Sequence, residues 1–320
     1  MTIHHMPWQE YDLADRSFHI FMSDPPFNLS EVERNALLIR PGWDVSWDPY
    51  PYINAAARGL VPGGWFVNKT SDRLFGSIRD MLSEDHSNTL SNLSWLFRMN
   101  ILSSDAYGDG VKNLHKDFVQ HPRFEYKATV VWTKNSGPYI GRDTTYLSRH
   151  ELFNVAKRLD EAGNSVQAPA WQFLSVKAMS NHFSCGPCGA GERLYWHLMN
   201  EYEENNQVRW EIVPCHDSKK CSLCADEVER RSHPCQTPLY VWNWFLERHA
   251  RKSLRLFDAF AGVGSLAKAC QLRGIEYVGT EISWEYATVG QMWIDGVWGV
   301  PEPEPEIEQL SMFGETDESN

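Results

Sequence analysis

The chain has 320 residues with 42 acidic and 30 basic side chains, which gives a formal net charge of −12. At roughly 100–200 residues per domain, this length allows one large domain or two small ones, with a core that needs no disulfide or metal. A hydrophobic fraction of 42% and a charged fraction of 22% exclude fibrous, collagen-like and wholly disordered classes. No apolar run approaches the roughly 18 residues of a membrane span, and the acidic, aromatic start lacks the layout of a signal peptide. We therefore expect a cytoplasmic protein without membrane contact, and the acidity argues weakly against non-specific nucleic-acid binding.

The first half of the chain predicts buried strands separated by helices and loops. Residues 18–24 (FHIFMSD) form a short apolar run that ends at an acid, which is typical of a buried parallel strand. Two prolines follow at once and force the chain out of the sheet. The further elements expected here are a helix over 52–60, a break at the PGG of 62–64, a strand over 65–69, a strand over 127–134, and a strand or short helix over 149–158.

The second half begins with the least regular stretch, 160–235, and then returns to alternating elements. The sequence predicts a helix over 237–250, a strand over 254–260, a glycine-rich turn with a helix, a strand over 275–283 and a final helix. This alternation predicts an α/β fold with a mostly parallel central sheet. The last twenty residues hold seven acids and no base, so they carry −7 of the −12 and leave −5 for the first 300 residues. We expect 299–320 to be an acidic, disordered tail.

Six of the seven cysteines fall within the irregular stretch, and four of them form two pairs: Cys185-x-x-Cys188 and Cys221-x-x-Cys224. In a cytoplasmic protein, two such pairs suggest a structural zinc site more than a disulfide framework. Each turn presents two thiolates to one tetrahedral ion. Cys215, His182, His197, His216 and Cys235 could each replace one of these ligands. Free buried thiols are the alternative.

A glycine-rich turn, Asp258-Ala-Phe-Ala-Gly262-Val-Gly264-Ser, lies between a predicted strand and a predicted helix. Glycines in such a turn let the backbone approach a ligand at a helix N-terminus. Glu281 ends the next strand, where a carboxylate can accept both hydroxyls of a ribose. No lysine follows as in a phosphate-binding loop. The turn therefore predicts a ligand with an adenosine-like ribose and little phosphate.

A second motif, Asp24-Pro25-Pro26-Phe27, lies at the carboxyl end of the first long strand, where open α/β sheets build their clefts. Asp24 and the Pro25 carbonyl can each accept a hydrogen bond from an amino group, and Phe27 offers a flat face on which a planar base can stack. A proline-rich turn after an edge strand is the structural alternative.

Together the two motifs resemble the amino-methylating DNA methyltransferases that use S-adenosylmethionine. DPPF is similar to their amino-site motif, and LFDAFAGVGSLAKAC with GIEYVGTEISWEYATVGQ is similar to their cofactor region. HPCQTPLYVWNWFLERHA (233–250), VVWTKNSGP and RHELFNVAKR also resemble family blocks. The likeness covers roughly half of the chain. Within it, Cys235 and Thr237 stand where the family usually has Thr and Lys.

The resemblance implies a Rossmann-like methyltransferase fold with an inserted target-recognition region. The amino-site motif precedes the cofactor motif, as in the circularly permuted class called beta. The implied division is a catalytic domain of 1–159 and 233–298 with an insertion at 160–232 that also holds the candidate zinc site. Residues 76–126 have no assigned role.

Residue by residue, the resemblance places Asp258, Phe260, Gly262 and Gly264 around the methyl donor and Glu281 at its ribose. Asp24, Pro25, Pro26 and Phe27 would hold a flipped target base, and the leading acid favours adenine N6 over cytosine N4. The expected activity is therefore site-specific methylation of adenine in DNA. The alternatives are cytosine-N4, RNA or protein-glutamine methylation, or a catalytically silent zinc-containing DNA-binding protein.

The expected substrate partner is double-stranded DNA, and a homodimer or a cognate restriction nuclease would also fit such an enzyme. Lys219, Lys220, Arg230 and Arg231 could touch phosphates, although scattered basic residues are more often a solvated face.

Overall fold

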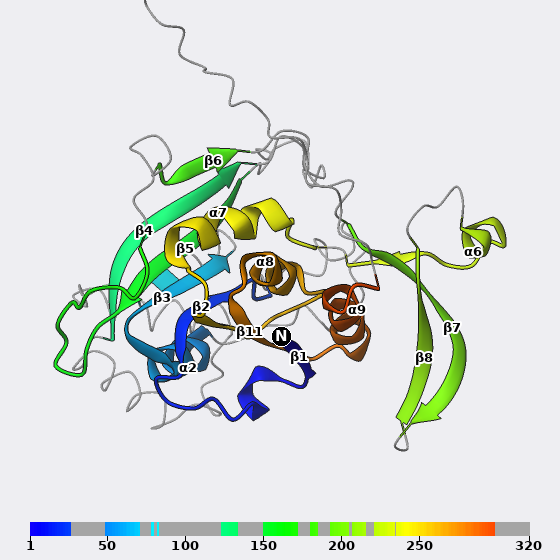
Figure 1. Ribbon diagram of the computed structural model, residues 1–320, viewed down its shortest axis with the longest axis horizontal. Helices are drawn as coiled ribbons and strands as arrows, with labels where there is room; N and C mark the ends of the chain where they lie inside the picture. Colours follow the sequence, from blue (N-terminus) through cyan, green and yellow to red (C-terminus); the bar gives the residue numbers. More distant parts are fainter. Residues whose placement is uncertain are drawn as a thin grey trace, which may run out of the picture.

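An eight-stranded sheet of order β1-β11-β10-β2-β3-β5-β4-β6 forms the centre of the molecule in the computed structural model (Figure 1). Neighbouring strands run parallel except for the pairs β3–β5 and β4–β5. The strands are β1 Thr2–His5, β2 Phe18–Ser23, β3 Leu60–Thr70, β4 Phe124–Thr133, β5 His150–Arg158, β6 His182–Ser184, β10 Arg255–Asp258 and β11 Glu276–Glu281. The structure describes residues 1–26, 49–70, 78–79, 82, 123–133, 150–171, 180–184, 193–204, 207–215, 221–233 and 235–297.

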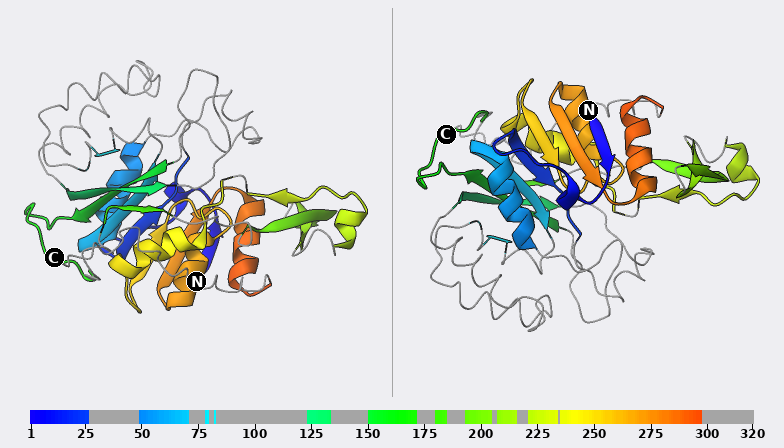
Figure 2. Two further views of the ribbon diagram at one scale, coloured as in Figure 1. Left: turned by 90° about the horizontal axis from the view of Figure 1, so that it is seen from above. Right: turned by 90° about the horizontal axis from the view of Figure 1, so that it is seen from below.

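Both faces of this sheet are buried, because its central strands are apolar at successive positions. In β2, Ile20 and Met22 join the core beneath helices α7 Leu239–His249, α8 Ser265–Arg273 and α9 Trp284–Ile294, whereas Phe21 joins the core beneath α2 Pro49–Gly59. Since side chains alternate along a strand, the run FHIFM supplies two cores at once. Figure 2 shows α2 on one side of the sheet and α7 to α9 on the other.

The helices that border the glycine-rich turn begin and end where the sequence provides caps. α8 lies between Gly264 at φ +79° and Gly274 at φ +66°, both left-handed. Such a conformation is open to glycine at little cost. α9 begins after Ser283, whose hydroxyl accepts a hydrogen bond from the amide of Tyr286. The start of each helix is thereby fixed next to the end of a strand.

A second, three-stranded sheet of order β8-β7-β9 projects from the main body beside α9 (Figures 1 and 2). It consists of β7 Tyr195–Glu204, β8 Gln207–Pro214 and β9 Arg231–Ser232, and the short helix α6 Ser222–Ala225 lies between β8 and β9 along the chain. A 3-10 turn, η1 Trp8–Glu10, completes the described elements.

The predicted α/β fold with a mostly parallel sheet is confirmed, with two local differences. β3 runs through the PGG of 62–64, where a break was expected, because the extra residues bulge between the pairs Phe18–Leu60 and Ile20–Trp65. The stretch 160–235 is also more regular than predicted, since β6, within the predicted insertion, pairs with β4 and a hairpin follows.

The division into domains stays a prediction, and the acidic tail 299–320 lies outside the described residues. Within the described part of the chain, no helix has the length and apolarity needed to cross a membrane.

Candidate active site

Four neighbouring parallel strands end at one edge of the sheet and bring the two sequence motifs together. The order β11-β10-β2-β3 places Glu281, Asp258, Asp24 and Lys69 at the carboxyl ends of adjacent strands. One hydrogen bond joins the motifs directly, because the amide of Ala259 donates to the hydroxyl of Ser23 over 2.9 Å. Residues more than 230 positions apart thus form one continuous edge.

Asp24 follows β2 and is held by two donors from other parts of the chain. The Lys69 ammonium, at the end of β3, donates to Asp24 Oδ2 over 2.7 Å, and the Thr237 hydroxyl donates to the same oxygen over 2.6 Å. Lys69 also contacts Glu151 Oε2 at 2.7 Å and Thr237 Oγ1 at 2.8 Å. Among the described residues, Lys69 and Thr237 both donate to Oδ2 of the Asp24 carboxylate.

The charges at this point are interdependent. Burial raises the pKa of Asp24 above its ordinary value, with the Lys69 ammonium opposing this rise and the Glu151 carboxylate adding to it. Burial alone would lower the pKa of Lys69, but the two carboxylates outweigh it and hold that pKa well above its ordinary value. Lys69 is therefore a permanent cation between two acids.

The rest of the amino-site motif is only partly described. Pro25 is buried and Pro26 is half-buried directly after Asp24. Phe27, the predicted stacking residue, lies outside the described residues.

Glu281 and the glycine-rich turn form the neighbouring half of the site. Glu281 Oε2 accepts from the amide of Gly262 and Oε1 accepts from the amide of Ser283, both over 2.8 Å. Burial raises the pKa of Glu281, and these backbone amides oppose the rise. Each carboxylate oxygen can accept more than one hydrogen bond, so Glu281 retains capacity for a ligand's hydroxyls.

The two predicted glycines have different surroundings. Gly262 has φ +52°, and a Cβ there would lie 3.5 Å from the imidazole of His233. Gly264 has φ +79°, and a Cβ there would lie 3.1 Å from the Cα of Gly290 in α9. Gly262 thus keeps the turn open toward His233, whereas Gly264 lets the turn pack against α9.

Asp258 and Phe260 help to shape this turn. Asp258 is buried, and it accepts hydrogen bonds from the Phe260 amide and the Tyr277 hydroxyl, each over 3.0 Å. Burial raises the pKa of Asp258 to about 7, and these donors oppose the rise. The Phe260 ring packs against Tyr52 of α2, with centroids 5.5 Å apart.

A separate group of potential metal ligands lies in the projecting sheet. His197, Cys215, Cys221 and Cys224 place their donor atoms within 4.8 Å of one another, and such a set could hold zinc. Cys221 and Cys224 belong to the predicted ligand set, and Cys215 and His197 were predicted as replacements. Cys185 and Cys188 lie outside the described residues.

The basic residues considered for phosphate contact have partners within the protein. Arg231 binds Glu285 at 3.0 Å, and Arg230 stacks on Tyr195 at 4.4 Å. Lys219 and Lys220 lie outside the described residues.

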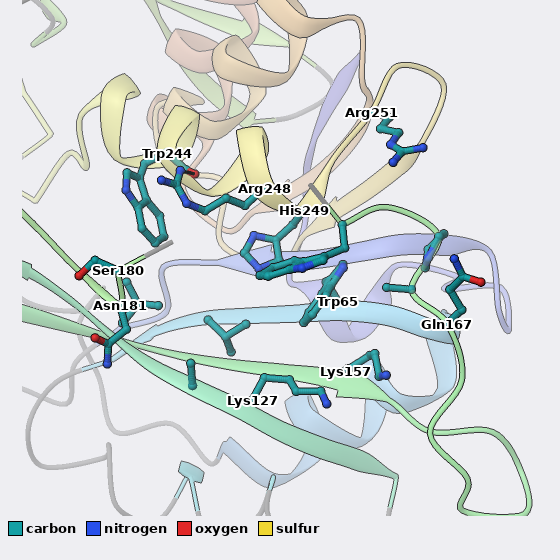
Figure 3. Close-up of a pocket in the computed structure, with 16 residues that line it drawn as sticks. Trp65, Lys127, Lys157, Gln167, Ser180, Asn181, Trp244, Arg248, His249 and Arg251 are labelled. Atoms are coloured by element: carbon teal, nitrogen blue, oxygen red, sulfur yellow. Dashed lines mark hydrogen bonds between the residues drawn. The ribbon is translucent and has the colours of Figure 1, made fainter. Parts of the chain in front are cut away.

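A cavity of about 660 Å3 lies between α7 and strands β3, β4 and β5 (Figure 3). Trp65, Arg248 and His249 line it, together with Lys127 and Lys157. It shares no residue with the site around Asp24, and Lys69 lies four residues further along β3, about 13 Å at the usual rise of a strand. The cavity is therefore separate from the aligned strand ends.

Sequence reasoning missed three side chains of the active-site edge: Lys69, Glu151 and His233. Lys69 had a detectable signal, since it ends the run WFVNK at the carboxyl end of a strand. Glu151 and His233 come from strands and loops distant in sequence, and only the folded sheet brings them here. Burial lowers the pKa of His233 to about 3, so its imidazole is neutral beside the glycine turn.

A doubly covered, mainly parallel sheet with a glycine turn and an Asp-Pro-Pro motif at adjacent strand ends defines a Rossmann-like methyltransferase. The profile of a DNA methylase family of the N6/N4 type matches residues 18–292. The chain therefore belongs to the N6/N4 DNA methylase family, whose members methylate amino groups of bases in DNA.

Comparison with solved structures concerns the fold alone. The crystal structure of M1.HpyAVI is 13% identical, with 93% of this chain and 99% of that chain covered and a TM-score of 0.52. The M1.HpyAVI–SAM complex is 16% identical, with coverages of 91% and 98% and a TM-score of 0.49. The cytosine-N4-specific PvuII DNA methyltransferase is 11% identical, with coverages of 88% and 80% and a TM-score of 0.46. No curated protein matches the chain in sequence.

Proposed function

We propose that this protein transfers a methyl group from S-adenosylmethionine to the N6 amino group of adenine in double-stranded DNA. The observation that carries the proposal is the position of Asp24. Lys69 and Thr237 both hold Oδ2 of Asp24 at the end of β2, beside the strand β10 that leads into the glycine turn. We assign the other oxygen, Oδ1, to accept a hydrogen bond from the target amino group. An exocyclic amino group is a donor that such an acceptor suits. The acid at this position, rather than a serine, favours adenine over cytosine.

The residues of the neighbouring half-site fit the cofactor. Gly262 lacks a side chain at the turn and is half-buried. The half-buried Glu281 carboxylate ends the adjacent strand, a position suited to ribose hydroxyls. The bound cofactor supplies an electrophilic methyl group on a sulfonium. We propose that Asp258 and Phe260 shape this half-site. Asp258 does so through its hydrogen bond from Tyr277, and Phe260 through its ring contact with Tyr52.

The contribution of the protein to the rate is mainly positional. Asp24 and the Pro25 carbonyl accept hydrogen bonds from the amino group and orient its nitrogen, and Phe27 would stack on the flipped base. Ordering the reacting groups in this way removes much of the entropic barrier, and no strong base is needed because the nitrogen loses its proton after attack. Burial raises the pKa of Asp24, and the Lys69 ammonium opposes this rise and so favours the charged form of the carboxylate.

We further propose that part of 160–232 recognises the target sequence. The support is geometric, since the hairpin β7–β8 extends from the body next to α9, and its Trp196 donates to Glu285 of α9 over 2.7 Å. A rigid arm attached beside the catalytic edge could contact DNA flanking the flipped base.

The test uses the purified full chain, methyl-labelled S-adenosylmethionine and duplex DNA, with digestion to nucleosides and mass spectrometry. We expect N6-methyladenine. Asp24→Asn should reduce transfer by about 100-fold or more, as removal of one preorganised polar contact does in other enzymes. Cofactor affinity, measured by calorimetry, should stay within about threefold, since Asp24 is not part of that half-site. Asp12→Asn, at an exposed acid, is the matched control and should leave transfer unchanged.

Three outcomes would contradict parts of the proposal. N4-methylcytosine as the product would overturn the choice of adenine while keeping the family. Transfer only to RNA, or only to glutamine in protein, would overturn DNA as substrate. Equal loss of transfer and cofactor binding in Asp24→Asn would assign Asp24 a structural role instead.

A further inference from the structure

Four side chains from three segments of the projecting sheet converge on one point. His197 comes from β7, Cys215 follows β8, Cys221 precedes α6 and Cys224 lies within it. His197 Nε2 lies 3.5 Å from Cys221 Sγ and 3.4 Å from Cys224 Sγ, and Cys215 Sγ lies 3.5 Å from Cys224 Sγ. A tetrahedral zinc ion with ordinary bond lengths separates its ligands by about 3.8 Å for two sulfurs and about 3.6 Å for sulfur and nitrogen. These three separations agree with such a ligand set within a few tenths of an ångström, and all four donor atoms lie within 4.8 Å of one another.

The histidine is oriented as a ligand. His197 is fully buried, and its Nδ1 lies 3.0 Å from the carbonyl oxygen of Glu229. A carbonyl can only accept, so Nδ1 carries the proton and Nε2 presents its lone pair to the thiols. Metal-bound histidines are commonly fixed by such a second hydrogen bond.

The local fold requires a cross-link at this point. α6 has four residues, and none of them is buried. A single helical turn is unstable alone. A small two-stranded hairpin is also marginal without further support. The thiol and imidazole groups are the contacts that tie α6 to β7.

The position of His197 gives such a cross-link a specific consequence. Adjacent residues of a strand face opposite sides, and Trp196, next to His197, faces α9. The Trp196 indole donates to Glu285 Oε1 over 2.7 Å, and Arg231 of β9 binds the other oxygen of Glu285 at 3.0 Å. β7 is therefore held to the catalytic body on one side and to the cysteine-bearing segment on the other.

We propose that His197, Cys215, Cys221 and Cys224 bind one Zn2+ in tetrahedral geometry, and that this ion holds α6 and the approach to β9 against the base of the β7–β8 hairpin. This ligand set replaces the pair Cys185 and Cys188 of the sequence prediction with Cys215 and His197. The metal site does not depend on the proposed methylation activity.

The first experiment measures zinc in the full-length protein purified under reducing conditions. We expect one zinc per chain in the wild type and in the double variant Cys185→Ser/Cys188→Ser. Cys215→Ser and His197→Gln should each lose most of the metal, and Ser222→Ala, beside Cys221 but without a ligand atom, should keep it. Loss of zinc in the Cys185/Cys188 variant with retention in Cys215→Ser would overturn the assignment in favour of the two cysteine pairs. Absence of zinc from the wild type would overturn the site altogether.

Cobalt and mass measurements separate metal binding from the alternatives. Added Co2+ should give the intense visible spectrum of a tetrahedral site with thiolate charge-transfer bands, and Cys215→Ser should weaken these bands. An intact mass lower by two hydrogen atoms without bound metal, restored by reductant, would instead show a disulfide and contradict the proposal. A metal-free, reduced wild type that stays folded and takes up no cobalt would show a hydrogen-bonded thiol cluster.

Limited proteolysis tests the structural consequence. Metal removal by a chelator should speed cleavage between residues 207 and 233 several-fold, while the central sheet stays resistant because its two cores contain none of the ligands. Cleavage that is unchanged by the chelator would refute the role of the ion in holding the hairpin.

Discussion

Replacement of Lys69 by methionine offers a quantitative test of the active-site electrostatics. The variant keeps an unbranched side chain, one heavy atom shorter than that of lysine, and removes the positive charge between Asp24 and Glu151. The Lys69 ammonium is 2.7 Å from an oxygen of each carboxylate, and the side chains of Lys69 and Asp24 are only 4% and 19% exposed. Loss of the cation should therefore raise the pKa of Asp24.

The size of the effect follows from the distance. At an effective dielectric constant of about 20, unit charges 2.7 Å apart interact by roughly 6 kcal/mol, an upper bound on the contribution of Lys69. One pKa unit corresponds to about 1.4 kcal/mol, so even a third of this energy raises the pKa of Asp24 by more than about one unit. Because Asp24 must be ionised to accept a hydrogen bond at both oxygens, the acidic limb of the rate profile should move to higher pH. Glu151→Gln should move it to lower pH, since the Glu151 charge raises the pKa of Asp24.

The assay is single-turnover methyl transfer at saturating cofactor and DNA, from about pH 5 to about pH 9. Lys127→Met, which removes a lysine on β4 away from this site, is the matched control and should leave the limb in place. Breaking a buried ion pair costs about 3–5 kcal/mol, so circular dichroism must show that Lys69→Met is folded at the assay temperature. An unmoved acidic limb, or a shift in the same direction in Lys69→Met and Glu151→Gln, would refute the reasoning.

Three further predictions concern the glycine turn and its carboxylates. In Gly264→Ala, the new Cβ sits on a left-handed backbone and only 3.1 Å from the Cα of Gly290. The free energy of unfolding, measured by thermal denaturation, should therefore fall by more than the roughly 1–2 kcal/mol that left-handed strain alone costs. Gly163→Ala, at φ +80° with no neighbour within 4 Å, should show that strain alone. Glu281→Gln should weaken cofactor binding about tenfold or more by calorimetry, because only one of its two terminal atoms remains an acceptor; unchanged affinity would remove Glu281 from the cofactor site. Asp258 has a folded-state pKa near 7, above its unfolded value, so its stabilising contribution is complete below about pH 4 and is lost as the pH rises through about 7. Asp258→Asn should flatten this part of the plot of melting temperature against pH, and an unchanged slope would show that Asp258 is not the group responsible.

The sequence was sufficient for the parts of the fold that local pattern determines. The apolar run at 18–24 and the alternation from 254 onward predict strands and helices that the structure contains. The strand order that makes β2 and β10 neighbours was not predicted. The glycine turn was recognisable because its residues are consecutive in the sequence. Gly262 and Gly264 both have positive φ, a conformation that glycine adopts at little cost.

The remaining features depend on contacts between distant segments. The Lys69–Asp24–Thr237 group joins residues from three parts of the chain, and a lysine at the end of a strand has no pattern that names its partner. Thr237 stands where the family usually has a lysine. In this protein the ammonium that contacts Asp24 belongs to Lys69 of β3. Similarly, spacing favoured Cys185 and Cys188 as ligands, whereas the pairing of β7 with β8 is what brings His197 and Cys215 together.

Among the described strands, the first, β1, pairs with the last, β11. β1 runs parallel to β11, the amide of Met6 donates to the Glu281 carbonyl over 3.0 Å, and the amide of Ile3 donates to the Gln291 side chain over 3.0 Å. During synthesis, residues 2–5 therefore leave the ribosome long before the strand that they cover exists. At the usual 5–20 residues per second, roughly 15–60 s pass before residue 281 is made. For that period the nascent chain holds an unpaired first strand and half of an active site, so cofactor can assist only the final closure of the sheet.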